Sequence, residues 1–146
     1  MILNLRHTGI VVGDLEAALH FYGELLGFKV TKRMDESGAY IDNMLGLQGV
    51  RVTTVKMAAP DGNLIEILYY QSHPRKARDQ REICEIGVSH VALTVDDLEL
   101  EYRRLSDAGV QFYAPPQLSP DDYAKVTFCR DPDGNPVELV QVLRSA

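Results

Sequence analysis

The chain reads H-T-G-I-V-V-G-D-L-E over residues 7–16 and H-V-A-L-T-V-D-D-L-E over residues 90–99. The two stretches share a leading histidine, an apolar run and an Asp-Leu-Glu ending. Each ending opens a segment with helical spacing of apolar residues, so each copy predicts a strand followed by a helix. His7 and His90 stand at the start of the two copies and therefore occupy equivalent positions.

A second motif is also duplicated. It reads P-D-G-N-L-I-E-I from Pro60 and P-D-G-N-P-V-E-L from Pro132, which aligns Glu66 with Glu138. Only two copies of each motif occur, which excludes a solenoid and favours a pseudo-symmetric pair of modules. One histidine and one glutamate thus recur at equivalent places in the two half-chains.

The first helix is expected from Asp14, a plausible N-cap, to Gly27, a plausible C-terminal stop. The second is expected from Asp96 or Asp97 to Gly109 by the same signals. Alternating apolar runs that follow each helix predict strands. These runs cover residues 28–34, 50–58, 64–70, 110–113, 125–130 and 137–143.

The resulting order of strand, helix and further strands in each half predicts an α+β fold in one domain, residues 1–146. We expect module 1 over residues 1–71, a charged linker over 72–85 and module 2 over 86–146. Loops around 42–47 and 115–123 are candidates for pocket rims, because loops carry specificity.

The composition limits the class of function. Apolar and charged fractions of 45% and 25% are those of a globular protein, and no run is long enough for a membrane span. A net charge of −6 opposes general binding to nucleic acid or anionic lipid. Cys84 and Cys129 are too few for a disulfide framework. We therefore expect a cytoplasmic protein acting on a small-molecule substrate.

Strand alternation assigns the four repeated polar residues to faces. Around each of them the β-branched and leucine residues fall on the opposite face, which should pack on the helices. The His/Glu face is then left to line a site. Two nearby carboxylates repel, and a divalent cation satisfies both. Imidazole and carboxylate donors suit Ni, Zn, Co, Fe or Mn. The candidate metal ligands are His7, Glu66, His90 and Glu138.

A simpler reading remains for the glutamates. Duplication could preserve Glu66 and Glu138 as members of the P-D-G-N-x-x-E turn motif, where they would cap the backbone of the turn and bind no metal.

The stretch from His7 to Phe28 and the D-P-D-G-N-P-V-E-L stretch from Asp131 resemble the vicinal oxygen chelate superfamily. That group includes glyoxalase I, methylmalonyl-CoA epimerase, extradiol dioxygenases and bleomycin-resistance proteins. The resemblance spans nearly the whole chain. It implies two β-α-β-β-β modules that form a cupped, partly closed sheet around a metal, with helices on the outer face, usually within a homodimer.

The resemblance also narrows the chemistry. With a carboxylate at the Glu66 position, the candidate ligand set resembles that of glyoxalase I, whereas the epimerase usually has glutamine there. Both are isomerases or lyases that move a proton next to a carbonyl through a metal-bound enediolate or enolate. Glu66 or Glu138 is then the expected catalytic base. The alternatives are an extradiol-type dioxygenase, a thiol transferase, or a non-catalytic antibiotic-binding protein.

Two departures concern the thiol substrate. Bacterial glyoxalase I commonly has an arginine at the position of Val11 and an asparagine at that of Tyr70, both tied to glutathione recognition. This chain lacks both. Of the other histidines, His20 is expected on the polar side of the first helix and His73 in the linker.

Overall fold

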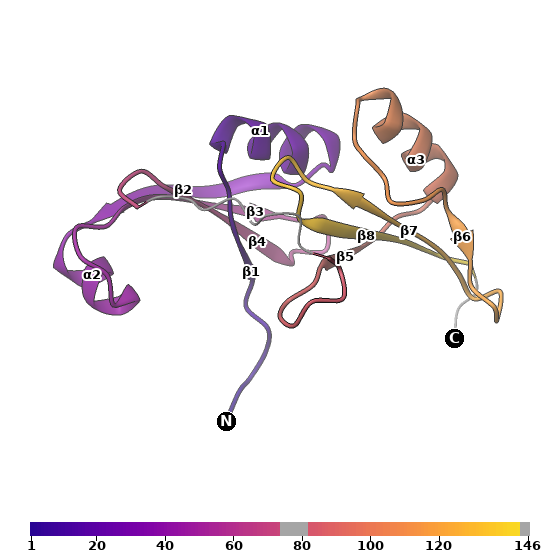
Figure 1. The fold of residues 1–146 in the computed structure, drawn as a ribbon. Helices are drawn as coiled ribbons and strands as arrows, with labels where there is room; N and C mark the ends of the chain where they lie inside the picture. Colours follow the sequence, from indigo (N-terminus) through magenta and orange to yellow (C-terminus); the bar gives the residue numbers. More distant parts are fainter. Residues whose placement is uncertain (74–81, 144–146) are drawn as a thin grey trace. The chain divides into compact units, whose positions relative to one another are not determined.

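A computed structural model describes residues 1–73 and 82–143 of the chain, and it has the expected α+β class. The chain divides into two compact units, Met1–Ala77 and Arg78–Ala146. Each unit holds one four-stranded mixed sheet; the described helices are α1, η1 and α2 in the first unit and α3 in the second (Figure 1). The linker expected over residues 72–85 falls largely on residues 74–81, which lie outside the described part.

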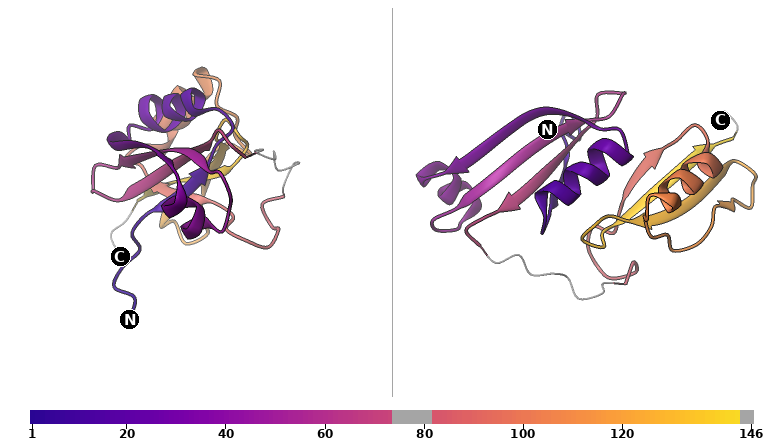
Figure 2. Two further views of the ribbon diagram at one scale, coloured as in Figure 1. Left: turned by 90° about the vertical axis from the view of Figure 1, so that its left-hand side faces the viewer. Right: turned by 90° about the horizontal axis from the view of Figure 1, so that it is seen from above.

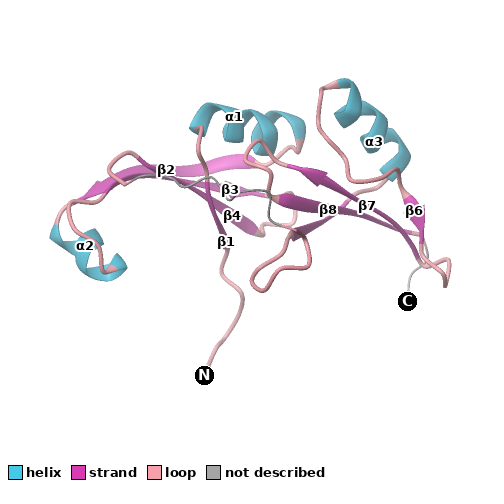
Figure 3. Cartoon of the chain, viewed as in Figure 1, coloured by secondary structure: helices cyan, strands magenta, loops and turns pink. Residues whose placement is uncertain are grey.

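The first unit is a sheet with strand order β1-β4-β3-β2 (Figure 3). Strands β1 and β4 are parallel, whereas β3 is antiparallel to both of its neighbours. The hairpin between β3 and β4 contains the first P-D-G-N turn, as the sequence predicts. The strands are β1 (Thr8–Val11), β2 (Lys29–Ser37), β3 (Arg51–Ala58) and β4 (Leu64–Tyr70).

The first predicted helix begins and ends at the expected residues. The Asp14 carboxylate accepts a hydrogen bond of 3.0 Å from the Ala17 N–H and caps α1 (Leu15–Leu19). The helix passes directly into a π-helical segment, η1 (His20–Leu25). It stops at Gly27, whose φ of 82° lies in the left-handed region that favours glycine.

The π-helical segment accounts for a small irregularity in the repeat. In the second copy, Asp97 caps α3 (Leu98–Asp107) through a 3.0 Å hydrogen bond from the Leu100 N–H, and Gly109 follows with φ of 86°. From capping aspartate to left-handed glycine, that copy is one residue shorter than the first. A π turn holds one more residue than an α turn, so η1 absorbs the extra residue without changing the strands that follow.

An additional helix, α2 (Ala39–Leu45), occupies the segment expected to be a pocket-rim loop. Figure 1 shows α2 and α1 on opposite sides of the first sheet. Ile41 of α2 packs with Val50 and Val52, and Leu68 and Tyr70 of β4 pack against this cluster. Because residues 66, 68 and 70 share one face of β4, α2 covers the far end of the face that carries Glu66.

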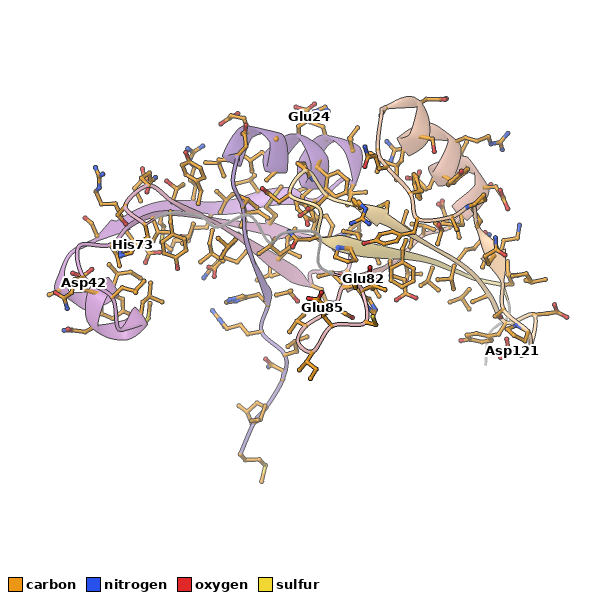
Figure 4. All side chains as sticks on the ribbon, viewed as in Figure 1. Glu24, Asp42, His73, Glu82, Glu85 and Asp121 are labelled. Carbon is orange, nitrogen blue, oxygen red and sulfur yellow. The ribbon has the colours of Figure 1, made fainter. Side chains whose placement is uncertain are left out.

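Asp42 fixes the connection from α2 to β3. Its carboxylate accepts hydrogen bonds of 2.8 Å from the Gly49 N–H and 2.7 Å from the Val50 N–H, and Figure 4 labels it on α2. The rim residue of the sequence prediction thus has a structural role.

The second unit repeats the plan with strand order β5-β8-β7-β6. Seen from above, α3 lies over β7 and β8 (Figure 2, right). As in the first unit, the outer strand β5 is parallel to β8, and β7 is antiparallel to it. The strands are β5 (Val91–Thr94), β6 (Gln117–Leu118), β7 (Ala124–Arg130) and β8 (Pro136–Val142).

The segment predicted as a strand over residues 110–113 lies along β7 but forms an isolated bridge and not a full strand. Only Phe112 bridges to the ladder, opposite Cys129, and the edge strand β6 forms a few residues later. Pro115 and Pro116 follow at once; proline donates no ladder hydrogen bond and ends the pairing.

The core of each unit lies between its helix and the adjacent sheet face, where Ile67 of the first unit and Leu139 of the second are fully buried. Within the described residues, no helix is long and apolar enough to span a membrane.

Candidate metal centre

The N-terminal pair consists of His7 and Glu66. His7 stands immediately before β1, and the parallel register places Gly9 opposite Glu66 on the neighbouring strand. The imidazole can therefore reach back along the same sheet face, and its Nε2 atom lies 3.2 Å from Glu66 Oε2. On the other side of the carboxylate, Lys56 Nζ lies 3.8 Å from Oε1. One carboxylate thus contacts an imidazole and an ammonium.

The C-terminal pair consists of His90 and Glu138 and repeats this geometry. His90 stands immediately before β5, Ala92 lies opposite Glu138, and His90 Nε2 is 3.1 Å from Glu138 Oε2. In place of a lysine, Phe128 lies opposite Glu138 in the antiparallel register. Its ring meets the His90 ring edge to face, with centroids 5.2 Å apart.

The two histidines differ in the contacts of their Nδ1 atoms. His90 Nδ1 lies 2.6 Å from Ser89 Oγ. With the proton on Nδ1, the serine hydroxyl accepts and Nε2 keeps its lone pair for a cation. His7 Nδ1 is buried and has no hydrogen-bond partner among the described residues. Only the C-terminal histidine is therefore oriented by a second contact.

Both carboxylates are partly withdrawn from water, with side chains 14% exposed for Glu66 and 20% for Glu138. A carboxylate in that position needs a compensating charge or donor. A divalent cation fits here, because each pair presents one imidazole nitrogen and one carboxylate oxygen close together on one sheet face. Within the described residues, no three His, Cys, Asp or Glu side chains group as a metal site would require. Each unit thus supplies two candidate donors.

The turn alternative for the glutamates is disfavoured by the hydrogen bonds of the two P-D-G-N segments. In the first copy, Asp61 accepts hydrogen bonds from the Asn63 N–H at 2.9 Å and from the Asn63 side-chain amide at 2.8 Å. These two bonds lower the pKa of the Asp61 carboxyl. In the second, Asp131 accepts from the Asn135 N–H at 2.7 Å. Neighbouring aspartates thus cap both turns, which frees the glutamates for other contacts.

Lys56 and Phe128 were missed as site residues by the sequence reasoning. The signal was present, because the offset that aligns Glu66 with Glu138 also aligns Lys56 with Phe128. Tyr113 extends the aromatic surface, with its ring centroid 6.3 Å from that of Phe128. Cys129, next to Phe128, faces the helix side, and burial raises the pKa of its thiol to about 12. Cys129 therefore lies on the face of β7 opposite to the candidate ligands.

The remaining candidates have other contacts. His20 is exposed and its Nδ1 lies 2.7 Å from Glu24 Oε2 on the outer side of the helix, where Figure 4 labels Glu24. His73 Nδ1 lies 2.8 Å from Ser72 Oγ. Tyr70 lies on the ligand face of β4, as alternation predicts, and packs against the cluster under α2.

Comparison with known families gives one match over most of the chain. The family described as the Glyoxalase/Bleomycin resistance protein/Dioxygenase superfamily matches residues 4–139. The chain is 27% identical over 142 residues to the uncharacterized protein YwbC of Bacillus subtilis, covering 97% of this chain and 99% of that protein. It is 27% identical over 138 residues to a probable lactoylglutathione lyase of Synechocystis, covering 94% of each.

Solved structures with the same fold include a glyoxalase family protein from Bacillus cereus. The TM-score is 0.88 at 24% identity, covering 99% of this chain and 97% of that one. A trypanothione-dependent glyoxalase I from Leishmania major gives a TM-score of 0.68 at 23% identity, covering 96% and 87%. At these identities the likeness extends to the fold alone.

Proposed function

The chain belongs to the Glyoxalase/Bleomycin resistance protein/Dioxygenase superfamily, and from this premise we propose that it is a metal-dependent lyase or isomerase that moves a proton next to a carbonyl. The observation that carries the proposal is the duplicated pair of imidazole and carboxylate, with Nε2–Oε2 distances of 3.2 Å and 3.1 Å at equivalent positions. The lyase name of the Synechocystis relative supports the same class.

In this proposal His7, Glu66, His90 and Glu138 would together hold one divalent cation. The donor set fits Ni, Zn, Co, Fe or Mn. When bound, the cation supplies the Lewis acidity that makes a proton beside a carbonyl easier to remove. A cation held by these four side chains would still be able to bind an oxygen of the substrate.

The protein's own part is to accept and return the proton. A carboxylate within hydrogen-bond reach of the substrate carbon takes the proton from one position and delivers it to the neighbouring one. Glu66 and Glu138 are the candidates for this base. Their partial burial keeps bulk water from competing for the proton.

Two residues that differ from those of bacterial glyoxalase I, Val11 and Tyr70, concern the thiol part of the substrate. Val11 lies on the same sheet face as Glu66 and is exposed, and Tyr70 is held under α2. Neither supplies the arginine or asparagine associated with glutathione. The proposal therefore covers the reaction class and leaves out glutathione as the substrate.

Metal analysis of the purified protein, followed by chelation and reloading, tests the proposal. We expect a stoichiometric divalent metal, together with metal-dependent incorporation of deuterium from D2O, followed by NMR. The label should enter the methyl group of pyruvate, or the C2 position of the thioester formed from methylglyoxal hemithioacetals. Oxygen uptake with a catechol would favour the dioxygenase alternative. Absence of stoichiometric metal, with ligand binding unaffected by chelation, would favour a non-catalytic binder.

A homodimer and a cytoplasmic location belong to the same proposal. Size-exclusion chromatography with light scattering of the metal-loaded protein tests the first of these.

A further inference from the structure

Lys56 places a positive charge beside one of the proposed metal ligands. It lies directly across from Glu66 in the β3–β4 register, with Nζ 3.8 Å from Oε1, while Oε2 faces His7. The Lys56 side chain is 24% exposed. A charge that is partly withdrawn from water is screened less than one on the open surface. The ammonium of Lys56 therefore attracts an anionic group that binds beside it.

The fold does not require a lysine at this position. In the second copy, Phe128 occupies the equivalent place opposite Glu138, in the same antiparallel ladder. The strands thus pair with either a lysine or a phenylalanine at this position. The difference lies on the ligand face, where it changes the charge of the site and not the packing of the core.

Neighbouring charges on the same face of the first sheet do not cancel that of Lys56. Lys32 lies opposite Lys56 on β2, and Glu36, further along β2, accepts a 3.0 Å hydrogen bond from Thr54 Oγ1. These two flanking charges are opposite in sign and offset each other. On the ligand face of the second sheet, the positively charged Arg130 is stacked 4.1 Å from the centre of the Tyr113 ring and likewise does not cancel the charge of Lys56.

We propose that Lys56 is a specificity-determining residue that selects substrates carrying a carboxylate next to the reacting carbonyl. The inference rests on the proposed function. Lys56 adds a positive charge directly beside the proposed ligand Glu66, on the face where a substrate would bind. A carboxylate on the substrate would pair with that ammonium, whereas a neutral amide would not. Because Nζ lies 3.8 Å from a proposed ligand oxygen, it reaches a substrate group adjacent to the metal-bound carbonyl.

The test compares pyruvate with its neutral isostere pyruvamide on the metal-loaded protein. Metal affinity is measured first by calorimetry for wild type, Lys56→Met, Lys56→Arg and the control Lys125→Met. Lys125 lies in β7, with its Nζ 3.1 Å from Glu99 Oε1 and a side chain 32% exposed, so the control removes a similar lysine–glutamate pair outside the site. Dissociation constants of the two compounds are then measured for each protein.

We expect all four proteins to bind the metal and the wild type to prefer pyruvate. Lys56→Met should lower that preference about tenfold, the loss typical of one charge-assisted hydrogen bond, whereas Lys56→Arg and Lys125→Met keep it. An unchanged preference in Lys56→Met, or no pyruvate binding by loaded wild type, would overturn the inference while leaving the metal site standing. Failure of the wild type to bind metal would overturn both this inference and the proposed function.

Discussion

The two copies of the repeat agree on the sheet face that packs against the helices. Met57 and Cys129 occupy equivalent positions, as do Ile67 and Leu139, and all four side chains are fully buried. None of these pairs is identical. Burial against a helix demands an apolar side chain of about the right volume, and several residues meet that demand.

The copies differ on the opposite face, which bears the candidate site. The histidine and the glutamate are retained, yet Lys56 is replaced by Phe128. Of the two candidate ligand histidines, His90 has a serine at its Nδ1 and His7 does not. Where the side chains are free of packing constraints, identity between copies points to a shared task. The differences then indicate that the His7/Glu66 half-site and the His90/Glu138 half-site contact different parts of a substrate.

The largest effect is expected when one carboxylate charge is removed at a time, which tests whether the His7/Glu66 and His90/Glu138 pairs are equivalent. Glu66→Gln and Glu138→Gln should each lower the deuterium-exchange rate by about 10²- to 10⁴-fold, because each removes a proposed ligand and a candidate base. Glu99→Gln, on α3, serves as the control. Activity and metal content near wild type in either site variant would show that the two pairs are not equivalent.

The agreement of the helix-facing sides can be tested by stability. Ile67→Ala and Leu139→Ala should each lower the free energy of unfolding by about 2–5 kcal/mol, because each leaves a cavity in a closed core. Leu118→Ala, at an exposed position in β6, should change it by less than about 0.5 kcal/mol. Urea denaturation followed by circular dichroism measures all three; a small effect of only one core variant would mean that the two cores are not equivalent.

Local signals were sufficient to predict most of the fold. The caps at Asp14 and Asp97, the left-handed glycines and the hairpin turns are decided within a few residues of sequence, and the structure confirms them. Helix α2 was missed because its seven residues are too few to show a helical period. Its position depends on Ile41 packing against strands elsewhere in the chain.

The candidate site could be predicted only as far as the repeat reveals it. Duplication identified both histidines and both glutamates, and alternation assigned them to one face. The same duplication hid Lys56 and Phe128, because a search for identical residues passes over positions where the copies differ. Lys56 and Phe128 matter because each lies opposite a glutamate on the neighbouring strand. The hairpin turns determine that register, but it becomes evident only when the two strands are aligned with each other.

The asymmetry of the two histidines gives the smallest expected effect. Ser89→Ala removes the group beside His90 Nδ1 and should weaken metal binding about tenfold, because the ring is no longer held in the tautomer and orientation that present Nε2 to a cation. Ser72→Ala serves as a control outside the candidate site, since Ser72 Oγ makes the same contact with Nδ1 of the adjacent His73 and also accepts a hydrogen bond from the Arg51 N–H. Calorimetric titration with the native metal measures both.

If the two half-sites contribute unequally to metal binding, the Ser89 contact is a physical cause of the difference. His7 Nδ1 already lacks a described partner, so its ring pays an orientation cost that His90 avoids. His7→Ala should then weaken metal binding less than His90→Ala in the wild-type background, and the gap should narrow when both are made in Ser89→Ala. An equal loss in all backgrounds would mean that the serine contact does not contribute, and that the two histidines are equivalent ligands after all.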